Sequence, residues 1–440
     1  MPYPSDTPST IENENTFSNK RSLQHFLRNI LAPLYVRDFL FLFSGQMIST
    51  LGDTFYAVAL PWLMLTGGHT PQELGLVLAC YGVPRVGTLL VGGMLSDRIG
   101  PRRVMLLSDC MRAVLIGVLT VLVLRGSTGV WQLCAIAVPL GGFTGLFLPA
   151  YYAMLPEVLP DEALQAGNAL NSSTIQLAIF LGSGLAGIVV GKFNPAIAFA
   201  IDVLTFVVSA ITLACMQRKR SEQFGQEGQS VQPSPQEGEQ ETRFPKETTL
   251  WQVMRSWRLF QVALLVVIFG NFLFYGMFEV ALPTLAHDQF AAGAGGYGLL
   301  LAVFGAGSLL GGLIAGGLGR LPHRGMLMLV LIMMLAGWYT FVPFAGGLVG
   351  ATLLIGCAGL TNGILTVLAF TLLQQQAPRH LLGRLMAVLM VATLGLYPFS
   401  VALAGIVSTH AGPRILFPIS GAMMLGAALF GWIQREVREL

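Results

Sequence analysis

Six ionisable residues are unusual because each lies inside a long run of apolar residues. They comprise four acids and two bases: Asp53, Asp109, Asp202, Glu279, Arg85 and Arg112. A charge at the centre of a membrane helix costs about 2.5–3.5 kcal/mol on insertion scales, so it is retained with a partner, with water or with a bound proton. Each of these residues is therefore a candidate for ion pairing, proton exchange or ligand binding.

Proton exchange is the chemistry that the acids suggest. Asp109 and Arg112 are three residues apart on one helix face, which favours a structural ion pair between them. Asp53 and Glu279 are the main candidates for proton coupling, since a carboxyl group in a water-filled cavity can carry a proton across a membrane. Asp202 is the third candidate, although its expected place near the outer end of a span favours a structural role. The alternative is that these acids bond neighbouring hydroxyl or backbone groups and only hold the bundle together.

Binding of an organic cargo needs polar and adaptable side chains near these acids. Arg85 follows Pro84, and it either neutralises one of the acids or binds an anion of the cargo. Rings and thioethers suit bulky amphipathic molecules, and the candidates for lining the cavity are Tyr56, Tyr275, Phe278 and Met390. In a chain with 27 Phe and 18 Met, most such side chains face lipid or core instead.

Membrane helices are the elements that must position these residues. Of the 440 residues, 54% are apolar and only 11% are charged, whereas a soluble protein carries about 25% charged residues. Runs long enough for the roughly 20 residues of a membrane helix recur along the chain. The twelve expected spans are 37–66, 72–96, 103–124, 130–153, 165–191, 194–216, 259–286, 295–319, 325–344, 347–374, 383–408 and 413–433. We therefore expect an all-α membrane protein with the lipid bilayer as its partner.

Several other classes are disfavoured by the same composition. A net charge of +3 is too small to indicate nucleic-acid binding. The five cysteines lie in apolar runs without ligand spacing, so we expect no metal site and no disulfide framework. No phosphate-binding motif is present, and we expect no cofactor. The six histidines fall in tails, loops or span ends, which leaves a membrane enzyme or a non-transporting receptor as a remote alternative.

The spans divide into two bundles of six, at residues 37–216 and 259–434. A linker at 217–258 is rich in Gln, Glu, Gly, Pro and Ser, a composition that cannot bury an apolar face. We expect a disordered tail at 1–36 and a short tail at 435–440. If the spans alternate, twenty of the 25 Lys and Arg residues lie on the side of the two termini and three on the opposite side. The positive-inside rule therefore predicts that both termini are cytoplasmic.

The two bundles also repeat one another. Val58–Pro61 recurs as Val280–Pro283 at an offset of 222 residues, and seven positions between Gly75 and Leu95 recur between Gly298 and Leu318 at an offset of 223. Two separate spans that agree within one residue indicate an internal duplication. Transporters built from such parallel repeats bind cargo near the midplane between the halves and alternate access by rocking.

The loop between the second and third spans carries a recognisable pattern, formed by Gly93, Asp97, Arg98, Gly100, Arg102 and Arg103. It resembles the loop signature of the major facilitator superfamily, Gly-x-x-x-Asp-Arg-x-Gly-Arg-Arg, except that Pro101 stands where the first of the paired basic residues is usual. The resemblance implies a conformational switch, in which Asp97 caps the cytoplasmic start of the eleventh span and the arginines complete a charge network. Gly93 then permits close helix contact. The corresponding loop of the second half, at Gly316–Pro322, lacks the acid, so we expect an asymmetric switch.

A second resemblance narrows the family. The stretches Pro149–Leu170 and Arg379–Arg384, with Gly395 and Pro398 after them, are similar to the bacterial macrolide and enterobactin exporters, and the similarity runs from about residue 37 to residue 434. It implies proton-driven export of a lipophilic small molecule (drug, macrolide or siderophore-like) by a monomer in a bacterial plasma membrane. Gly182–Gly187 replaces the Gly-Pro that antiporters carry in the fifth span. Uptake, or lysolipid transport, on the same fold is therefore the alternative.

Overall fold

The computed structural model describes residues 32–216, 257–290, 292–317, 323–376 and 382–438. All regular elements within those ranges are helices. Eleven of these helices are long and apolar enough to cross a membrane, and α3 adds a twelfth span if its two parts, bent by 53°, are counted as one. The predicted fold class, an all-α protein of twelve spans, is confirmed. Residues 1–31 of the expected N-terminal tail, residues 439–440 of the C-terminal one and most of the central linker lie outside the described residues.

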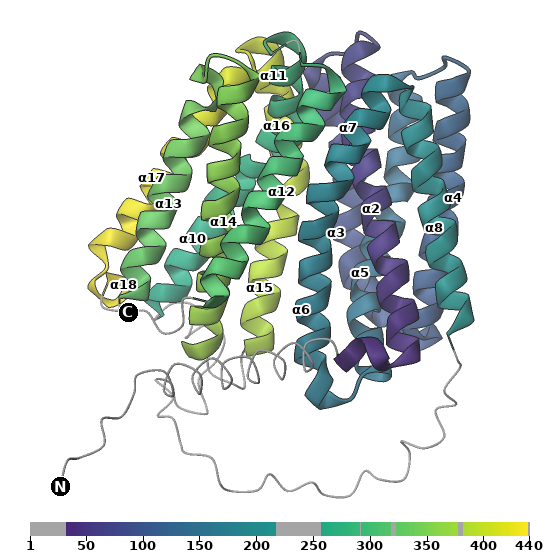
Figure 1. The fold of residues 1–440 in the computed structure, drawn as a ribbon, viewed down its shortest axis with the longest axis horizontal. Helices are drawn as coiled ribbons and strands as arrows, with labels where there is room; N and C mark the ends of the chain where they lie inside the picture. The colour runs from purple at the N-terminus through teal and green to yellow at the C-terminus, as the bar shows by residue number, and fades with distance from the viewer. Residues whose placement is uncertain (1–31, 217–256, 291, 318–322, 377–381, 439–440) are drawn as a thin grey trace, which may run out of the picture.

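The first half lies on the right of Figure 1, coloured from purple to teal. Its helices are η1 (Ala32–Tyr35), α2 (Arg37–Thr66), α3 (Pro71–Ile99), α4 (Pro101–Leu124), α5 (Val130–Val158), α6 (Asp161–Leu177), η2 (Ala178–Gly182), α7 (Ser183–Lys192) and α8 (Pro195–Cys215). The elements α6, η2 and α7 run on without a break and together form the fifth span.

The second half lies on the left of Figure 1, coloured from green to yellow. Its helices are α10 (Arg258–Gly276), η3 (Met277–Ala281), α11 (Leu282–Asp288), α12 (Gly293–Gly317), α13 (Arg324–Phe341), η4 (Val342–Phe344), α14 (Leu348–Gln376), α15 (Leu382–Gly395), α16 (Tyr397–His410), η5 (Pro413–Ile415), α17 (Leu416–Ile433) and α18 (Arg435–Arg438). The seventh span is α10 with η3 and α11, and the eleventh is α15 with α16.

Helix boundaries follow from local chemistry at the ends. Thr70 caps α3, because its hydroxyl accepts a 3.2 Å hydrogen bond from the Glu73 N–H while the Glu73 carboxylate accepts one of 2.7 Å from the Thr70 N–H. Gly100 joins α3 to α4 with a φ of +88°, a value that favours glycine. Pro101, the departure from the loop signature, occupies the first turn of α4, where a missing N–H costs nothing.

Two spans contain a π-helical turn, and one of these turns carries a site residue. Pro283 has no N–H to donate to the carbonyl of Glu279 four residues earlier, and the seventh span widens over Met277–Ala281 at this point. The fifth span widens over Ala178–Gly182, where the glycine-rich run begins, without a proline. The repeated Pro61, by contrast, lies within a continuous α2.

The internal duplication is also visible in how the helices pack. α3 packs on α5 as α12 packs on α14, and α4 packs on α8 as α13 packs on α17. Glycines allow the close approach in the first of these pairs, because an added Cβ would meet the main chain of the facing helix. Gly141 faces Tyr81, Gly145 faces Arg85, Gly359 faces Phe304 and Gly363 faces Ser308. The two bundles therefore use equivalent contacts at equivalent positions.

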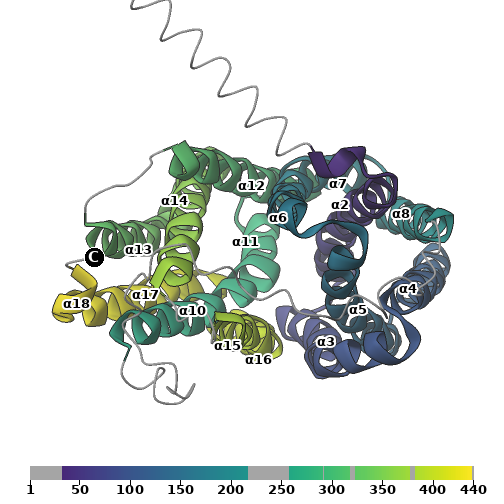
Figure 2. The ribbon, with the colours of Figure 1, turned by 90° about the horizontal axis from the view of Figure 1, so that it is seen from below.

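The two halves meet along two seams, α3 with α16 and α7 with α12, on opposite edges of the bundle pair in Figure 2. At the first seam the Gln72 N–H, at the start of α3, donates a 2.9 Å hydrogen bond to the Thr409 hydroxyl, near the end of α16. Gly187 and Gly298 face each other at the second. Near the ends of α3 and α12, a Cβ placed on Gly93 or Gly316 would meet no atom of a neighbouring described helix within 4 Å. The contacts of Gln72 with Thr409 and of Gly187 with Gly298 therefore join the halves at the end away from the start of α2.

Candidate functional site

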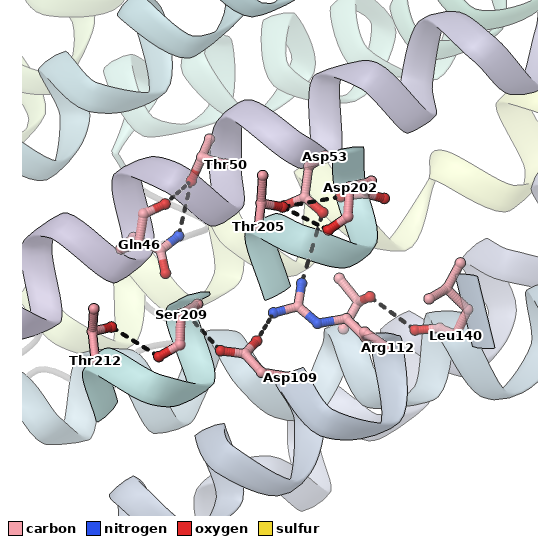
Figure 3. A network of polar contacts seen from close by, with 11 residues as sticks. Gln46, Thr50, Asp53, Asp109, Arg112, Leu140, Asp202, Thr205, Ser209 and Thr212 are labelled. Atoms are coloured by element: carbon pink, nitrogen blue, oxygen red, sulfur yellow. Dashed lines mark hydrogen bonds and ion pairs between the residues drawn. The ribbon is translucent and has the colours of Figure 1, made fainter. Parts of the chain in front are cut away.

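A polar network joins three helices in the middle of the first half (Figure 3). Arg112 of α4 pairs with Asp109 on the same helix and lies 3.8 Å from a carboxylate oxygen of Asp53 on α2. Ser209 of α8 donates a 2.6 Å hydrogen bond to the other oxygen of Asp109. Asp109 and Arg112 are 0% and 2% exposed. The pair that the sequence suggested as structural therefore also reaches the proton-coupling candidate Asp53.

Two phenyl rings complete the surroundings of Arg112. Its guanidinium carbon lies 4.6 Å from the ring centroid of Phe147 and 4.3 Å from that of Phe206. Such cation–π contacts stabilise a desolvated guanidinium by about 2 kcal/mol. The Nε of Arg112 is buried and has no hydrogen-bond partner within the described ranges. Arg112 is thus held as a buried cation mainly by two carboxylates and two rings.

Asp53 and Asp202 lie on facing helices but differ in exposure. The Asp53 side chain is 49% exposed although it sits halfway along α2, whereas Asp202 of α8 is 1% exposed. The Thr205 hydroxyl lies 3.4 Å from an Asp202 carboxylate oxygen. Gly52 allows α2 to approach, since a Cβ there would lie 2.5 Å from the Asp202 carboxylate. In the described part of the chain, Asp202 has no basic group within 4 Å, so two acids share the region of one arginine.

A second cluster lies where the two halves meet. The Tyr397 hydroxyl of α16 donates a 2.5 Å hydrogen bond to Glu279 in η3. The Tyr397 ring packs edge-on against Tyr275 of α10 at 5.0 Å and against Tyr81 of α3 at 6.4 Å. The guanidinium of Arg85 lies over the Tyr81 ring at 5.7 Å. Residues from both halves therefore surround Glu279.

The remaining cargo candidates separate into different surroundings. Tyr56 is half-buried and packs on Tyr81 and Phe199. Phe278 is 5% exposed and stacks on Phe274 at 4.4 Å, so in this conformation it belongs to the core of the second half and not to an accessible surface. The side chain of Met390 lies outside what the structure describes.

In the predicted switch loop, Arg102 is hydrogen-bonded to α8, whereas Asp97 and Arg98 are exposed. Arg102 donates 2.8 Å hydrogen bonds to the carbonyls of Leu213 and Ala214, where it satisfies the open C-terminal end of α8. Arg103 reaches only the carbonyl of Ile99, at 3.5 Å. Arg98 and Asp97 are exposed, and Asp97 has no hydrogen bond or ion pair within the described ranges.

Asp97 was expected to meet the start of the eleventh span. Residues 377–381, which lead into that span, are outside the described residues, so this contact stays a prediction. Asp97 lies near the end of α3, at the opposite end of that helix from the contact between Gln72 and Thr409. Its exposure is what a released switch would show in this conformation.

Some residues of the site carried no signal that the sequence analysis used. Tyr397 and Tyr81 were not singled out, although each is a polar ring in a span that also carries a candidate. The duplication offered a signal for Tyr81, because the repeat offset aligns this polar ring with the apolar Phe304. The equivalence of Tyr397 with Ile179 comes from their packing on Gly82 and Gly305, which only the structure shows. Ser209 lies 100 residues from Asp109, and no sequence pattern predicts that contact. Among the described residues, no group of three or more His, Cys, Asp or Glu could hold a metal.

Comparison with known proteins gives a consistent family. A family model described as Major Facilitator Superfamily matches residues 42–396 and 264–440. The chain is 23% identical over 413 residues to the multidrug efflux pump Tap of Mycolicibacterium fortuitum, covering 91% of this chain and 96% of that protein. It is 23% identical over 362 residues to the enterobactin exporter EntS of Salmonella typhi, covering 78% and 79%.

A solved structure shares the fold. A bacterial homologue of the iron transporter ferroportin, described in an inward-facing state, superposes with a TM-score of 0.64 at 15% identity. The match covers 90% of this chain and 98% of that one. At this identity the likeness concerns the arrangement of helices alone.

Proposed function

We propose that this chain, which belongs to the Major Facilitator Superfamily, is a proton-coupled exporter of lipophilic small molecules that works by alternating access. The chain is a membrane transporter and not an enzyme. The efflux relatives Tap and EntS support the direction of transport. Their names give different cargoes, several drugs for Tap and enterobactin for EntS, so these relatives do not determine the cargo class of this chain.

One observation carries the proposal. Asp53 is half exposed at mid-span, while the hydrogen bond between Gln72 and Thr409 joins the halves at the end away from the start of α2. A carboxylate in the middle of a membrane protein is exposed in this way when water reaches it from one side. Rocking of the halves about their seams would close that side and open the other, so that a proton on Asp53 is exchanged with the opposite compartment.

The acids would take different parts in coupling. Asp53 faces the accessible space and would exchange the proton, while Asp202 stands behind it as a buried second acid. Of the described guanidinium groups, that of Arg112 lies within 4 Å of Asp53, and Asp109 already engages it, whereas Arg85 acts on Asp53 only from a greater distance. Since one cation cannot balance three carboxylates, at least one acid is expected to hold a proton during the cycle.

Glu279 would couple protonation to the contact between spans. Its bond to Tyr397 ties the π-turn of the seventh span to the eleventh, and the Gly276 N–H donates a 2.8 Å bond to the Ser400 hydroxyl beside it. A change of charge on Glu279 alters the strength of the Tyr397 bond, because hydrogen bonds to ionised groups are about twice as strong as neutral ones. Asp97, with the loop arginines, would stabilise the outward-facing conformation by closing the cytoplasmic side.

We place the protein in a bacterial plasma membrane as a monomer with both termini in the cytoplasm, so that the described conformation opens inward. Reporter fusions test this orientation. A fusion at Gly225 should report the cytoplasm and one at Gly346 the exterior. The same compartment for both would contradict the twelve-span topology.

The exporter proposal is tested in inside-out vesicles that contain the overproduced chain. A panel of lipophilic dyes and macrolides is offered with and without an imposed proton gradient, acidic inside. We expect at least one compound to accumulate in the vesicles, with loss of accumulation when the gradient is dissipated. Accumulation that follows the cargo gradient alone, indifferent to pH, would refute proton coupling but leave transport intact.

A further inference from the structure

Arg85 is an intramembrane arginine without an acidic partner in contact. It lies midway along α3, its residue surface is partly exposed, and its guanidinium lies over the Tyr81 ring. In the described part of the chain, no carboxylate lies within 4 Å of it and no hydrogen bond reaches its guanidinium. A charge in that place costs free energy unless water or a ligand solvates it. The side chain therefore borders an accessible space inside the bundle.

The two nearest carboxylates are engaged elsewhere. Arg85 is within electrostatic range of Glu279 and of Asp53. Glu279, however, accepts the 2.5 Å bond of the Tyr397 hydroxyl, and Asp53 lies 3.8 Å from Arg112. Each of these acids has a polar partner in contact, whereas among the described residues no carboxylate is in contact with Arg85.

The duplication shows that the fold does not need an arginine at this position. The counterpart of Arg85 in the second half is Ser308, whose carbonyl faces Gly363 as that of Arg85 faces Gly145. Ser308 is 2% exposed and its hydroxyl donates a 3.1 Å bond to the carbonyl of Gly359. A small buried side chain thus satisfies the same packing, so the guanidinium has a reason other than helix packing.

Tyrosines of both halves lie near the guanidinium, Tyr81 on α3 itself and Tyr275 and Tyr397 on α10 and α16. Arg85 lies within electrostatic range of Tyr81, Tyr275 and Tyr397. Tyr275 packs edge-on against Tyr397, and Tyr56 lies 6.5 Å from Tyr81. A guanidinium with five donors beside phenolic rings can bind an anionic oxygen group and hold an aromatic ring next to it.

We propose that Arg85, with the tyrosines around it, is the cargo subsite for an anionic group, and that the cargo is an aromatic molecule carrying a carboxylate, a sulfonate or an acidic phenol. This rests on the proposed function, since it names the class of molecule that the exporter carries. Asp53 and Glu279 then serve proton exchange, and Arg85 serves recognition. The rings supply apolar surface, and the guanidinium selects the charge.

The test uses two probes that share one ring system. These are 8-anilinonaphthalene-1-sulfonate and N-phenyl-1-naphthylamine, which lacks the sulfonate. Binding is measured by equilibrium dialysis against the full chain in phosphatidylcholine nanodiscs, where no anionic lipid competes. For Arg85→Gln we expect the Kd of the sulfonate probe to rise at least about tenfold, or about 1.4 kcal/mol, with less than a twofold change for the neutral probe. Arg85→Lys, which keeps the charge, should lie between the two.

A matched control separates a site from general loss of charge. Arg125→Gln removes an exposed arginine at the end of α4 and should change neither Kd. Retained binding of the neutral probe shows that Arg85→Gln is folded. Equal weakening of both probes, or of neither, overturns the anion subsite.

Two further experiments test whether Arg85 only neutralises Glu279 and whether the site binds lipid instead. If Arg85 only neutralises Glu279, the effect of Arg85→Gln on sulfonate binding disappears in a Glu279→Gln background, whereas the subsite predicts that it persists. If lysophosphatidylglycerol displaces the sulfonate probe and 2-naphthoate does not, the site binds lipid and the aromatic assignment is wrong.

Failure of this inference is distinguishable from failure of the proposed function. If vesicles accumulate the neutral probe under a proton gradient but sulfonate binding does not depend on Arg85, the exporter proposal holds and the anion subsite is wrong. If sulfonate binding depends on Arg85 but the chain moves no compound of the panel against its gradient, the anion subsite holds and the exporter proposal is wrong.

Discussion

Gly298→Ala should shift the protein away from the described conformation. A Cβ on Gly298 would lie 2.5 Å from the carbonyl oxygen of Ser183, 2.7 Å from the Cα of Gly187 and 3.0 Å from its nitrogen. All three atoms belong to the main chain of α7, so no side-chain rotation relieves the overlap. Overpacking of this kind costs about 1–3 kcal/mol. The cost applies when the seam is closed and disappears when the halves rock apart there, which shifts the equilibrium by about 5–150-fold.

The assay measures disulfide cross-linking at the seam between α3 and α16. Because Gly298 lies at the other seam, an effect on cross-linking reports movement of one whole half relative to the other. Gln72→Cys and Thr409→Cys, whose backbone nitrogen and hydroxyl are 2.9 Å apart in the described state, are introduced into a chain with its five native cysteines replaced. The rate of disulfide formation under mild oxidation is then proportional to the fraction of molecules closed at this end. We expect Gly298→Ala to slow cross-linking by up to the shift in the equilibrium, about 5–150-fold, because the closed fraction falls no faster than the equilibrium constant.

The control is Gly316→Ala on the same helix. A Cβ at Gly316 meets no described atom within 4 Å, while both substitutions raise helix propensity by about 1 kcal/mol. Cross-linking in this control should not be slower than in the parent chain. If Gly298→Ala leaves the rate unchanged while the variant is folded and inserted, the glycine seam is not a gate and the halves do not rock as rigid bodies.

Four other substitutions test the charged residues. Asp97→Asn should leave the protein folded and inserted but sharply reduce vesicle transport, since the closure that needs its charge is lost; normal turnover would reduce the loop signature to a topology signal. Asp53→Asn and Glu279→Gln are compared for dye binding and for uphill transport at several pH gradients, and at least one should bind cargo without concentrating it. Wild-type pH dependence in both single variants and in the double variant would make these carboxylates structural. Arg112→Leu should destabilise the protein by about 3–5 kcal/mol, because Asp109 is left buried without its cation; thermal unfolding measures this, and Asp109→Asn in the same chain should recover part of the loss.

The sequence was sufficient to predict the spans, the duplication and the family. A membrane helix must satisfy its own backbone and present apolar side chains over about 30 Å, so spans are local features that composition reveals. The twelve predicted ranges agree with the helices to within a few residues at most ends. Pro101 illustrates the limit of a motif comparison, since it looked like a departure and proved to be a residue suited to the first turn of α4.

Tertiary structure decided which of the buried charges meet. Helices in lipid are apolar on nearly every face, so their sequence does not tell which side faces a neighbour and which faces hydrocarbon. Asp53 reaches Arg112 across two helices, Glu279 meets Tyr397 from 118 residues away, and Phe278 turns into the core. These pairings follow from how helix faces pack, together with which end of the molecule is closed. Packing between distant segments sets both, and for that reason the candidate residues could be named from the sequence while their partners and their access to water could not.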